Sequence, residues 1–147
     1  MVIISAEKED LQKILDLQYL SYQSEARLLN NTDIPPLKQT LSEILAEYEK
    51  GIILKLLDGD NIIGSVRAYT ENGTLYIGKL FIHPDFQGKG LGTRLLREIE
   101  RICPHKRCEL FTSSQSLRNL SLYQRVGYKI FKEKNISDNL KFIYLEK

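Results

Sequence analysis

The chain has little of several residue types, and each shortage excludes a class of protein. Its 147 residues contain no tryptophan, one methionine and two cysteines. Two cysteines are too few for the disulfide framework of a small secreted domain. No apolar run approaches the roughly 20 residues that a membrane span needs, and the N-terminus lacks the basic segment and cleavage site of a signal peptide. We therefore expect a cytoplasmic protein with no membrane partner.

The chain also lacks an excess of either charge. It has 21 Lys and Arg residues against 19 Asp and Glu residues, a net charge of +2. Without a basic cluster larger than Lys106-Arg107, that balance predicts no nucleic-acid partner. Cys103, His105 and Cys108 offer three soft ligands, one fewer than a closed zinc site takes. We expect no metal and two reduced thiols.

What is present is an ordinary globular composition, 42% hydrophobic and 27% charged. This length fits one domain, which we expect over residues 1–147. Apolar spacing and turn residues predict the elements in order. They are a strand at 2–5, helices at 7–24 and 37–50, strands at 52–57, 62–70 and 75–82, a helix at 91–102, a strand at 107–112, a helix at 117–126, and strands at 128–132 and 141–145. Residues 25–36 are expected to form an irregular connection or a weak helical turn followed by a stop, and residues 133–140 to form a loop.

The connections predict how the strands pair. Turns of a few residues join strands 52–57, 62–70 and 75–82, which should form an antiparallel meander. The helix at 91–102 lies between strands 75–82 and 107–112, so these two strands should be parallel. The expected fold is a mixed α/β (α+β) arrangement, a seven-stranded, mostly antiparallel sheet with helices on both faces.

The stretch 75–102 carries the clearest functional signal. An apolar strand ends at His83-Pro84, and Gln87-Gly88-Lys89-Gly90-Leu91-Gly92 then opens an amphipathic helix. The first backbone N–H groups of a helix are unpaired and lie at the positive end of its dipole. Glycines at alternate positions let an anion approach them. The stretch therefore predicts a phosphate or pyrophosphate site, unless the glycines only allow a tight turn.

Spacing distinguishes among glycine loops. A Walker A loop needs Ser or Thr after its lysine, but Gly90 follows Lys89. A dinucleotide fingerprint needs G-x-G-x-x-G, whereas Gly88, Gly90 and Gly92 give G-x-G-x-G. Both of these nucleotide sites are disfavoured.

The loop resembles the Q/R-x-x-G-x-G/A signature of the GNAT superfamily of N-acetyltransferases. A second match lies downstream, where Asn119, Tyr123, Gly127 and Tyr128 resemble that family's helix and following strand. The expected element order also resembles the GNAT fold along essentially the whole chain. In that fold the parallel pair of strands splays apart at the centre of the sheet.

The resemblance implies acetyl-coenzyme A as the donor. The backbone of the glycine loop would hold the pyrophosphate, with Lys89 and Arg94 either helping or remaining solvated. The strand before the loop would carry a bulge and pair with the pantetheine arm, and a freed N–H there would polarise the thioester. The implied donor-binding residues are Leu80, Phe81, Ile82, Gln87, Gly88, Lys89, Gly90, Leu91, Gly92, Thr93, Asn119 and Tyr123.

The resemblance also implies catalytic roles. Tyr123 matches the family's acid, which protonates the departing thiolate. Many members have a Glu on the strand before the loop that acts as the general base, but this chain has Gly78-Lys79 there. Glu25 is the substitute candidate, with a solvated loop charge as the alternative. Arg67 and Tyr69 are candidates for lining the acceptor pocket.

The expected activity is transfer of an acetyl group to a primary amine of a small molecule, or else of a protein, by direct attack. The alternative is a coenzyme A-binding or regulatory module without catalysis. The sequence leaves open the acceptor, the length of the acyl group and the oligomeric state, a homodimer included.

Overall fold

The structure is a computed structural model that describes residues 1–30 and 32–147. Its elements are β1 (Val2–Ser5), α1 (Leu11–Leu29), α2 (Pro35–Lys38), α3 (Leu41–Lys50), β2 (Ile52–Asp58), β3 (Asn61–Glu71), β4 (Thr74–Ile82), α4 (Leu91–Ile102), β5 (Arg107–Ser113), α5 (Leu117–Val126), β6 (Lys129–Ser137) and β7 (Leu140–Glu146). Short 3-10 turns precede α1 and follow β4.

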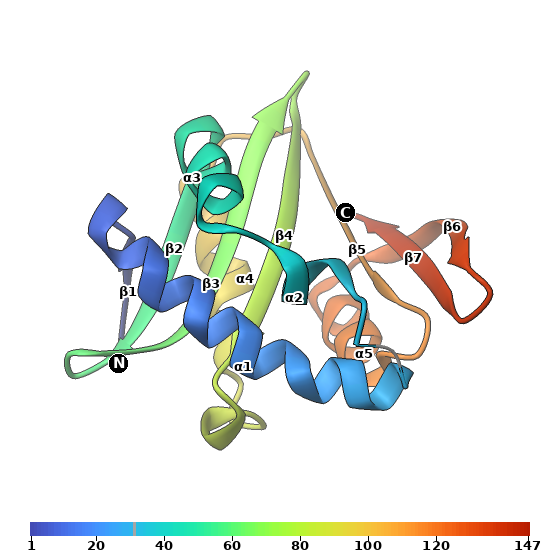
Figure 1. Ribbon diagram of the computed structural model, residues 1–147. Helices are drawn as coiled ribbons and strands as arrows, with labels where there is room; N and C mark the ends of the chain where they lie inside the picture. The colour runs from blue at the N-terminus through green and yellow to red at the C-terminus, as the bar shows by residue number, and fades with distance from the viewer. Residues whose placement is uncertain (31) are drawn as a thin grey trace.

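The strands form one seven-stranded sheet in the order β1-β2-β3-β4-β5-β7-β6. Only the central β4–β5 pair is parallel, and the other five pairings are antiparallel. The predicted fold class, meander and parallel crossover are therefore confirmed. In Figure 1, α1 and α3 lie in front of β1–β4 and α4 lies behind them, while β5–β7 diverge to one side with α5 beneath.

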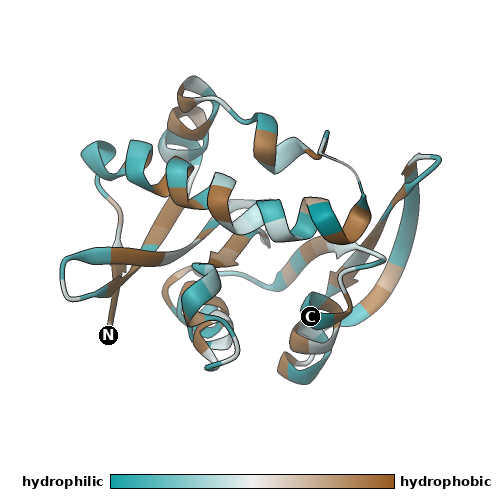
Figure 2. Ribbon diagram, turned by 60° about the horizontal axis from the view of Figure 1, so that its bottom comes forward, coloured by the Kyte–Doolittle hydropathy of each residue, from teal (hydrophilic) through white to brown (hydrophobic). Residues whose placement is uncertain are grey.

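The core forms where α4 meets the sheet. Leu95, Leu96 and Ile99 on α4 are fully buried and pack with residues of β2–β5 and β7, such as Val66 and Leu145. Each such side chain contributes about 1.5–3 kcal/mol when buried. Figure 2 shows the largely apolar strands between the two layers of helices. This packing fixes the start of α4 against the end of β4.

Three sequence predictions are wrong in detail. Residues 25–29, expected to be an irregular connection or at most a weak helical turn, continue the long helix α1, because Ala26 and Leu29 are buried in a small cluster with Leu140. The helix then ends at Asn30, which has a left-handed backbone with φ 51°.

The single helix expected at 37–50 is two helices, α2 and α3, and the second ends at Lys50 as expected. Thr40 begins α3 with a capping box, in which the Glu43 N–H donates to Thr40 Oγ1 at 3.2 Å and the Thr40 N–H donates to Glu43 Oε1 at 3.0 Å. The final hairpin is also longer than predicted, because β6 pairs with β7 as far as Ser137 and Leu140. Every residue of β6 is exposed, and the strand lacks the alternating apolar pattern from which its full length could have been predicted.

Candidate functional site

The glycine loop forms an open concave backbone. Gly88 and Gly90 have φ angles of 78° and 77°, a conformation that costs any residue with a Cβ. A Cβ at Gly90 would meet no atom within 4 Å, so the space beside the loop is open. Gly90 is the N-cap of α4, and the unpaired N–H groups of the first helical turn face outward from this point. The arrangement suits an anion.

Side chains brace the loop from two directions. The Gln87 amide donates from Nε2 to the Ile82 carbonyl at 3.0 Å, and Arg118 Nη1 on α5 donates to Gln87 Oε1 at 2.8 Å. An added Cβ on Gly88 would lie 3.5 Å from Arg118 Nη2. A guanidinium therefore lies beside the loop, where it adds a positive charge to the helix dipole.

The strand before the loop carries a bulge. Ser65 on β3 pairs with Phe81, but Arg67 pairs with Gly78, so two residues of β4 oppose one residue of β3. One of the two is Lys79, which has φ 50°. The bulge that the resemblance implied is therefore present.

Beyond the bulge, β4 and β5 separate. Their pairing covers only Thr74–Arg107, Leu75–Cys108 and Tyr76–Glu109. After Glu109, β5 continues in register with β7. The rest of β4 has an open edge inside the sheet, where an extended ligand can reach backbone groups.

A cavity of about 540 Å³, here the loop cavity, lies between the glycine loop, α1, α5 and the open part of β4. It is lined by most of the donor-binding residues predicted from the sequence. These are Leu80, Phe81, Ile82, Gln87, Gly88, Gly90, Leu91, Gly92, Thr93 and Asn119. The predicted Lys89 is not among its lining residues and is exposed, with Nζ 5.3 Å from the Phe86 ring centre.

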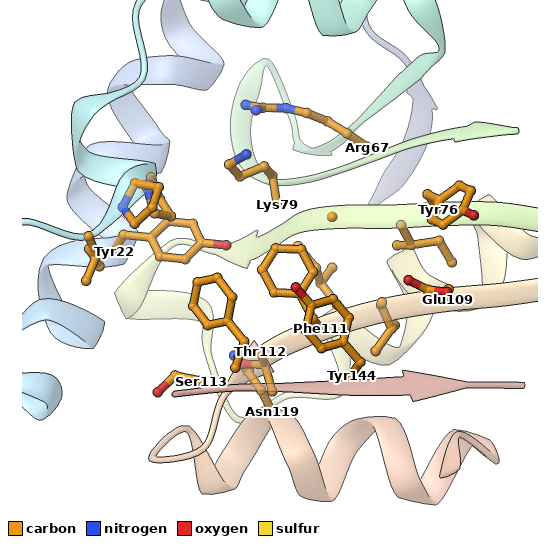
Figure 3. A pocket seen from close by; sticks show the side chains of 18 of the residues that line it. Tyr22, Arg67, Tyr76, Lys79, Glu109, Phe111, Thr112, Ser113, Asn119 and Tyr144 are labelled. Atoms are coloured by element: carbon orange, nitrogen blue, oxygen red, sulfur yellow. The ribbon is translucent and has the colours of Figure 1, made fainter. Parts of the chain in front are cut away.

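A second cavity of about 600 Å³, here the aromatic cavity, opens on the other side of the split between β4 and β5. Tyr69 and Tyr76 stack with ring centres 5.1 Å apart, and Phe111 lies 4.8 Å from Phe142 and 5.2 Å from Tyr144 by the same measure. Figure 3 shows Phe111 and Tyr144 on one side of this cavity, with Arg67 and Lys79 on the other. The cavity thus has an aromatic wall and a cationic wall.

Four residues line both cavities, namely Tyr22, Glu25, Leu80 and Asn119. The Glu25 carboxylate on α1 accepts a hydrogen bond from the Ser116 hydroxyl, which comes from the turn before α5. Asn119 Nδ2 donates to Thr112 Oγ1 at 3.3 Å. The fold therefore brings the candidate carboxylate to the place where the two cavities meet.

Two tyrosines approach this junction. Tyr123 lines the aromatic cavity from α5 and is 6% exposed, and Tyr22 enters from α1. Burial raises the pKa of Tyr123, and the nearby Tyr22 and Glu25 raise it further. Burial also raises the pKa of Tyr22, with Glu25 adding to the effect. Both phenols are therefore protonated at neutral pH and each can donate a hydrogen bond.

Gly78 and Lys79, which occupy the β4 position where many family members have a glutamate, line the aromatic cavity. A Cβ at Gly78 would meet nothing within 4 Å, so the missing side chain leaves room in the aromatic cavity. The predicted lining residues Arg67 and Tyr69 both face this cavity. Burial lowers the pKa of Lys79, an effect that Glu47 opposes.

Sequence reasoning missed several lining residues. Arg118, Tyr22 and Ser116 belong to no motif, and only the packing of α1 and α5 around the sheet brings them to the cavities. Cys103 and Cys108 are free thiols, and the described part of the chain holds no group of three His, Cys, Asp or Glu residues placed to bind a metal. None of its helices is long and apolar enough to cross a membrane.

Solved structures share this fold at low sequence identity. The structure of yncA from Salmonella typhimurium, solved with its cofactor acetyl-CoA, is 19% identical, covers 100% of this chain and 92% of its own, and superposes with a TM-score of 0.77. The paia N-acetyltransferase from Thermoplasma acidophilum, solved with coenzyme A, is 18% identical, with 98% of both chains covered and a TM-score of 0.78.

Sequence comparison gives a relative and a family. The UPF0157 protein YqkA of Bacillus subtilis (strain 168) is 26% identical over 119 residues, which make up 80% of this chain and 34% of YqkA. The chain therefore spans about a third of the length of this curated relative. The sequence profile of the acetyltransferase (GNAT) family matches residues 10–128, and together with the glycine loop, the bulge and the split sheet this match shows that the chain belongs to the GNAT family.

Proposed function

We propose that the protein is an N-acetyltransferase that moves the acetyl group of acetyl-coenzyme A to a primary amine of a small molecule. The observation that carries the proposal is the meeting of the loop cavity and the aromatic cavity at Tyr22, Glu25, Leu80 and Asn119. A donor in one cavity and an acceptor in the other would bring their reacting ends together there, without an acyl-enzyme.

The donor is proposed to lie in the loop cavity. The first N–H groups of α4, with Arg118 nearby, would bind the pyrophosphate. The pantetheine arm would run along the open edge of β4 as an added strand, next to Asn119. The N–H of Leu80, at the bulge, is the candidate donor to the thioester carbonyl oxygen as negative charge develops on it.

The two proton transfers are assigned to Glu25 and Tyr123. Glu25, directly or through a water, would take a proton from the ammonium form of the acceptor. The free amine nitrogen would then bond to the carbonyl carbon while the C–S bond breaks. Tyr123 would protonate the leaving sulfur, and the proton released by the attacking nitrogen would restore the phenol. The products are an amide and the thiol of coenzyme A.

The test measures thiol release from acetyl-coenzyme A against a panel of amines, with donor affinity measured separately by calorimetry. We expect saturable donor binding and amine-dependent thiol release. Donor binding without turnover of any amine would favour the binding or regulatory module. Turnover of peptide amines alone would move the acceptor from small molecules to proteins.

A further inference from the structure

The charges that line the aromatic cavity are unevenly distributed. Arg67 Nη1 lies 3.3 Å from Glu47 Oε1, and Lys79 Nζ lies 3.9 Å from the same oxygen. Two cations therefore share one carboxylate. A third, Lys50, also lines the cavity and lies 3.8 Å from the Tyr69 ring centre. This wall carries an excess of positive charge.

Arg67 is a fixed charge behind the cavity surface. It is 3% exposed, and its Nη atoms donate to Gln18, Gln39 and Glu47. Its Nε is the buried side-chain nitrogen that has no hydrogen-bond partner in the described part of the chain. A buried charge that is incompletely paired is stabilised by an anion that binds nearby, which makes binding of that anion more favourable.

Lys79 is the charge that a ligand can reach. Its side chain is 26% exposed, and it makes a long ion pair with Glu47. Its backbone is left-handed at the bulge, which costs a non-glycine residue about 1–2 kcal/mol. Next to it, Gly78 leaves the cavity unfilled. In Figure 3 the Lys79 side chain lies on the same side of β4 as Arg67, and both line the aromatic cavity.

The negative charges are placed differently. Glu109, at the far end of the cavity, is paired with Arg107 at 2.9 Å. Glu25 lies at the junction with the loop cavity, and its hydrogen-bond donor is the neutral Ser116 hydroxyl. The cavity therefore offers a carboxylate at the junction and cations on the β3–β4 wall, with aromatic rings opposite those cations.

We propose that the acceptor is an amino acid-like zwitterion with an apolar or aromatic body, whose carboxylate binds at Lys79 in front of Arg67 while its amine lies at Glu25. This inference rests on the proposed function and narrows its substrate class. Phe111 and Tyr144 would contact the body of the molecule. A polyamine would bring a second positive charge against Lys79 and Arg67, which disfavours it.

The test compares pairs of amines that differ by one carboxylate. Phenylalanine is paired with 2-phenylethylamine and with phenylalanine amide, and tyrosine with tyramine, and each is assayed by thiol release with the wild-type protein. We expect the carboxylated member of each pair to have the higher kcat/KM. In Lys79→Met the KM for the carboxylated amines should rise about ten- to hundredfold, as expected for loss of one hydrogen bond between charged groups.

Two further variants separate binding from folding. Lys79→Arg keeps the charge and should retain most of the preference for carboxylated amines. Lys13→Met, on the exposed face of α1, should change nothing. If the wild type turns over the amines without a carboxylate as well as or better than the carboxylated ones, the zwitterion proposal is overturned, while the proposal of acetyl transfer remains. Donor binding without turnover of any amine would overturn both proposals.

Discussion

Replacing Gly90 with alanine should separate the conformational role of the glycine loop from its role in binding. Gly90 has φ 77°, so a Cβ costs about 1–2 kcal/mol of backbone strain. The added methyl group would meet no protein atom within 4 Å, so no steric clash adds to this cost. For a chain of this size we expect the melting temperature to fall by about 2–8 °C.

The same methyl group would project into the space beside the first N–H groups of α4. An anion held there would lose at least one charge-assisted hydrogen bond, which corresponds to about a tenfold or larger rise in the Kd for coenzyme A. Isothermal titration calorimetry measures this affinity. Thermal unfolding of the free protein measures the strain independently.

Gly127→Ala is the matched control. Gly127 ends α5 with φ 110°, and an added Cβ would lie 3.7 Å from a Lys147 side-chain carbon, an ordinary contact. It should lose stability as Gly90→Ala does, but keep its affinity for coenzyme A. If both variants bind coenzyme A as tightly as the wild type, the loop is a tight turn and not an anion site, and the argument for the donor fails.

Three other substitutions test separate parts of the molecule. Tyr123→Phe keeps the buried ring and should lower kcat about a hundredfold or more with donor affinity unchanged; an unaltered kcat removes Tyr123 as the acid. Glu25→Gln should slow transfer by a similar factor at neutral pH, and the deficit should shrink as pH rises toward the pKa of the amine, because the free amine then needs no base; a deficit that is constant with pH contradicts the role. Burial alone would raise the pKa of Asp10, but hydrogen bonds from Lys55 and from the Glu7 N–H lower it below its ordinary value of 3.8. The ionised carboxylate therefore stabilises the fold above about pH 4, and this contribution is lost as pH falls through the lowered pKa. In urea unfolding, the free energy of unfolding should therefore fall less between pH 5 and pH 2 for Asp10→Asn than for the wild type.

Much of the fold follows from local pattern. The apolar residues of α4 recur at helical spacing, and Gly127 ends α5 where its left-handed φ requires glycine, so both helices were predicted at their observed positions. The end of α1 was missed, because Ala26 and Leu29 are buried by Leu140, which lies more than a hundred residues away along the chain. A window of local sequence does not contain that contact.

The candidate site, like the fold, could be predicted only in part from local sequence. The backbone conformation of the loop depends on glycines at alternate positions and could be predicted from their spacing. Tyr22 reaches the junction, and Ser116 and Arg118 reach the loop cavity, only through the packing of α1 and α5. Glu25 was selected through the resemblance, and its hydrogen bond to Ser116 joins residues 91 positions apart. Lys79 was noted as a departure from the family pattern, but its strained backbone is visible only in three dimensions.

The separation of β4 from β5 after Tyr76 also affects how the protein avoids unwanted association. An unpaired strand edge on a protein surface invites pairing with another chain and promotes aggregation. Here the unpaired part of β4 lies within the sheet, between α1 on one side and α5 on the other. Residues of α1 and α5 line the opening and lie beside the unpaired backbone, where a second sheet would have to dock. The same geometry that exposes backbone hydrogen-bonding groups to a ligand therefore shields them from neighbouring proteins.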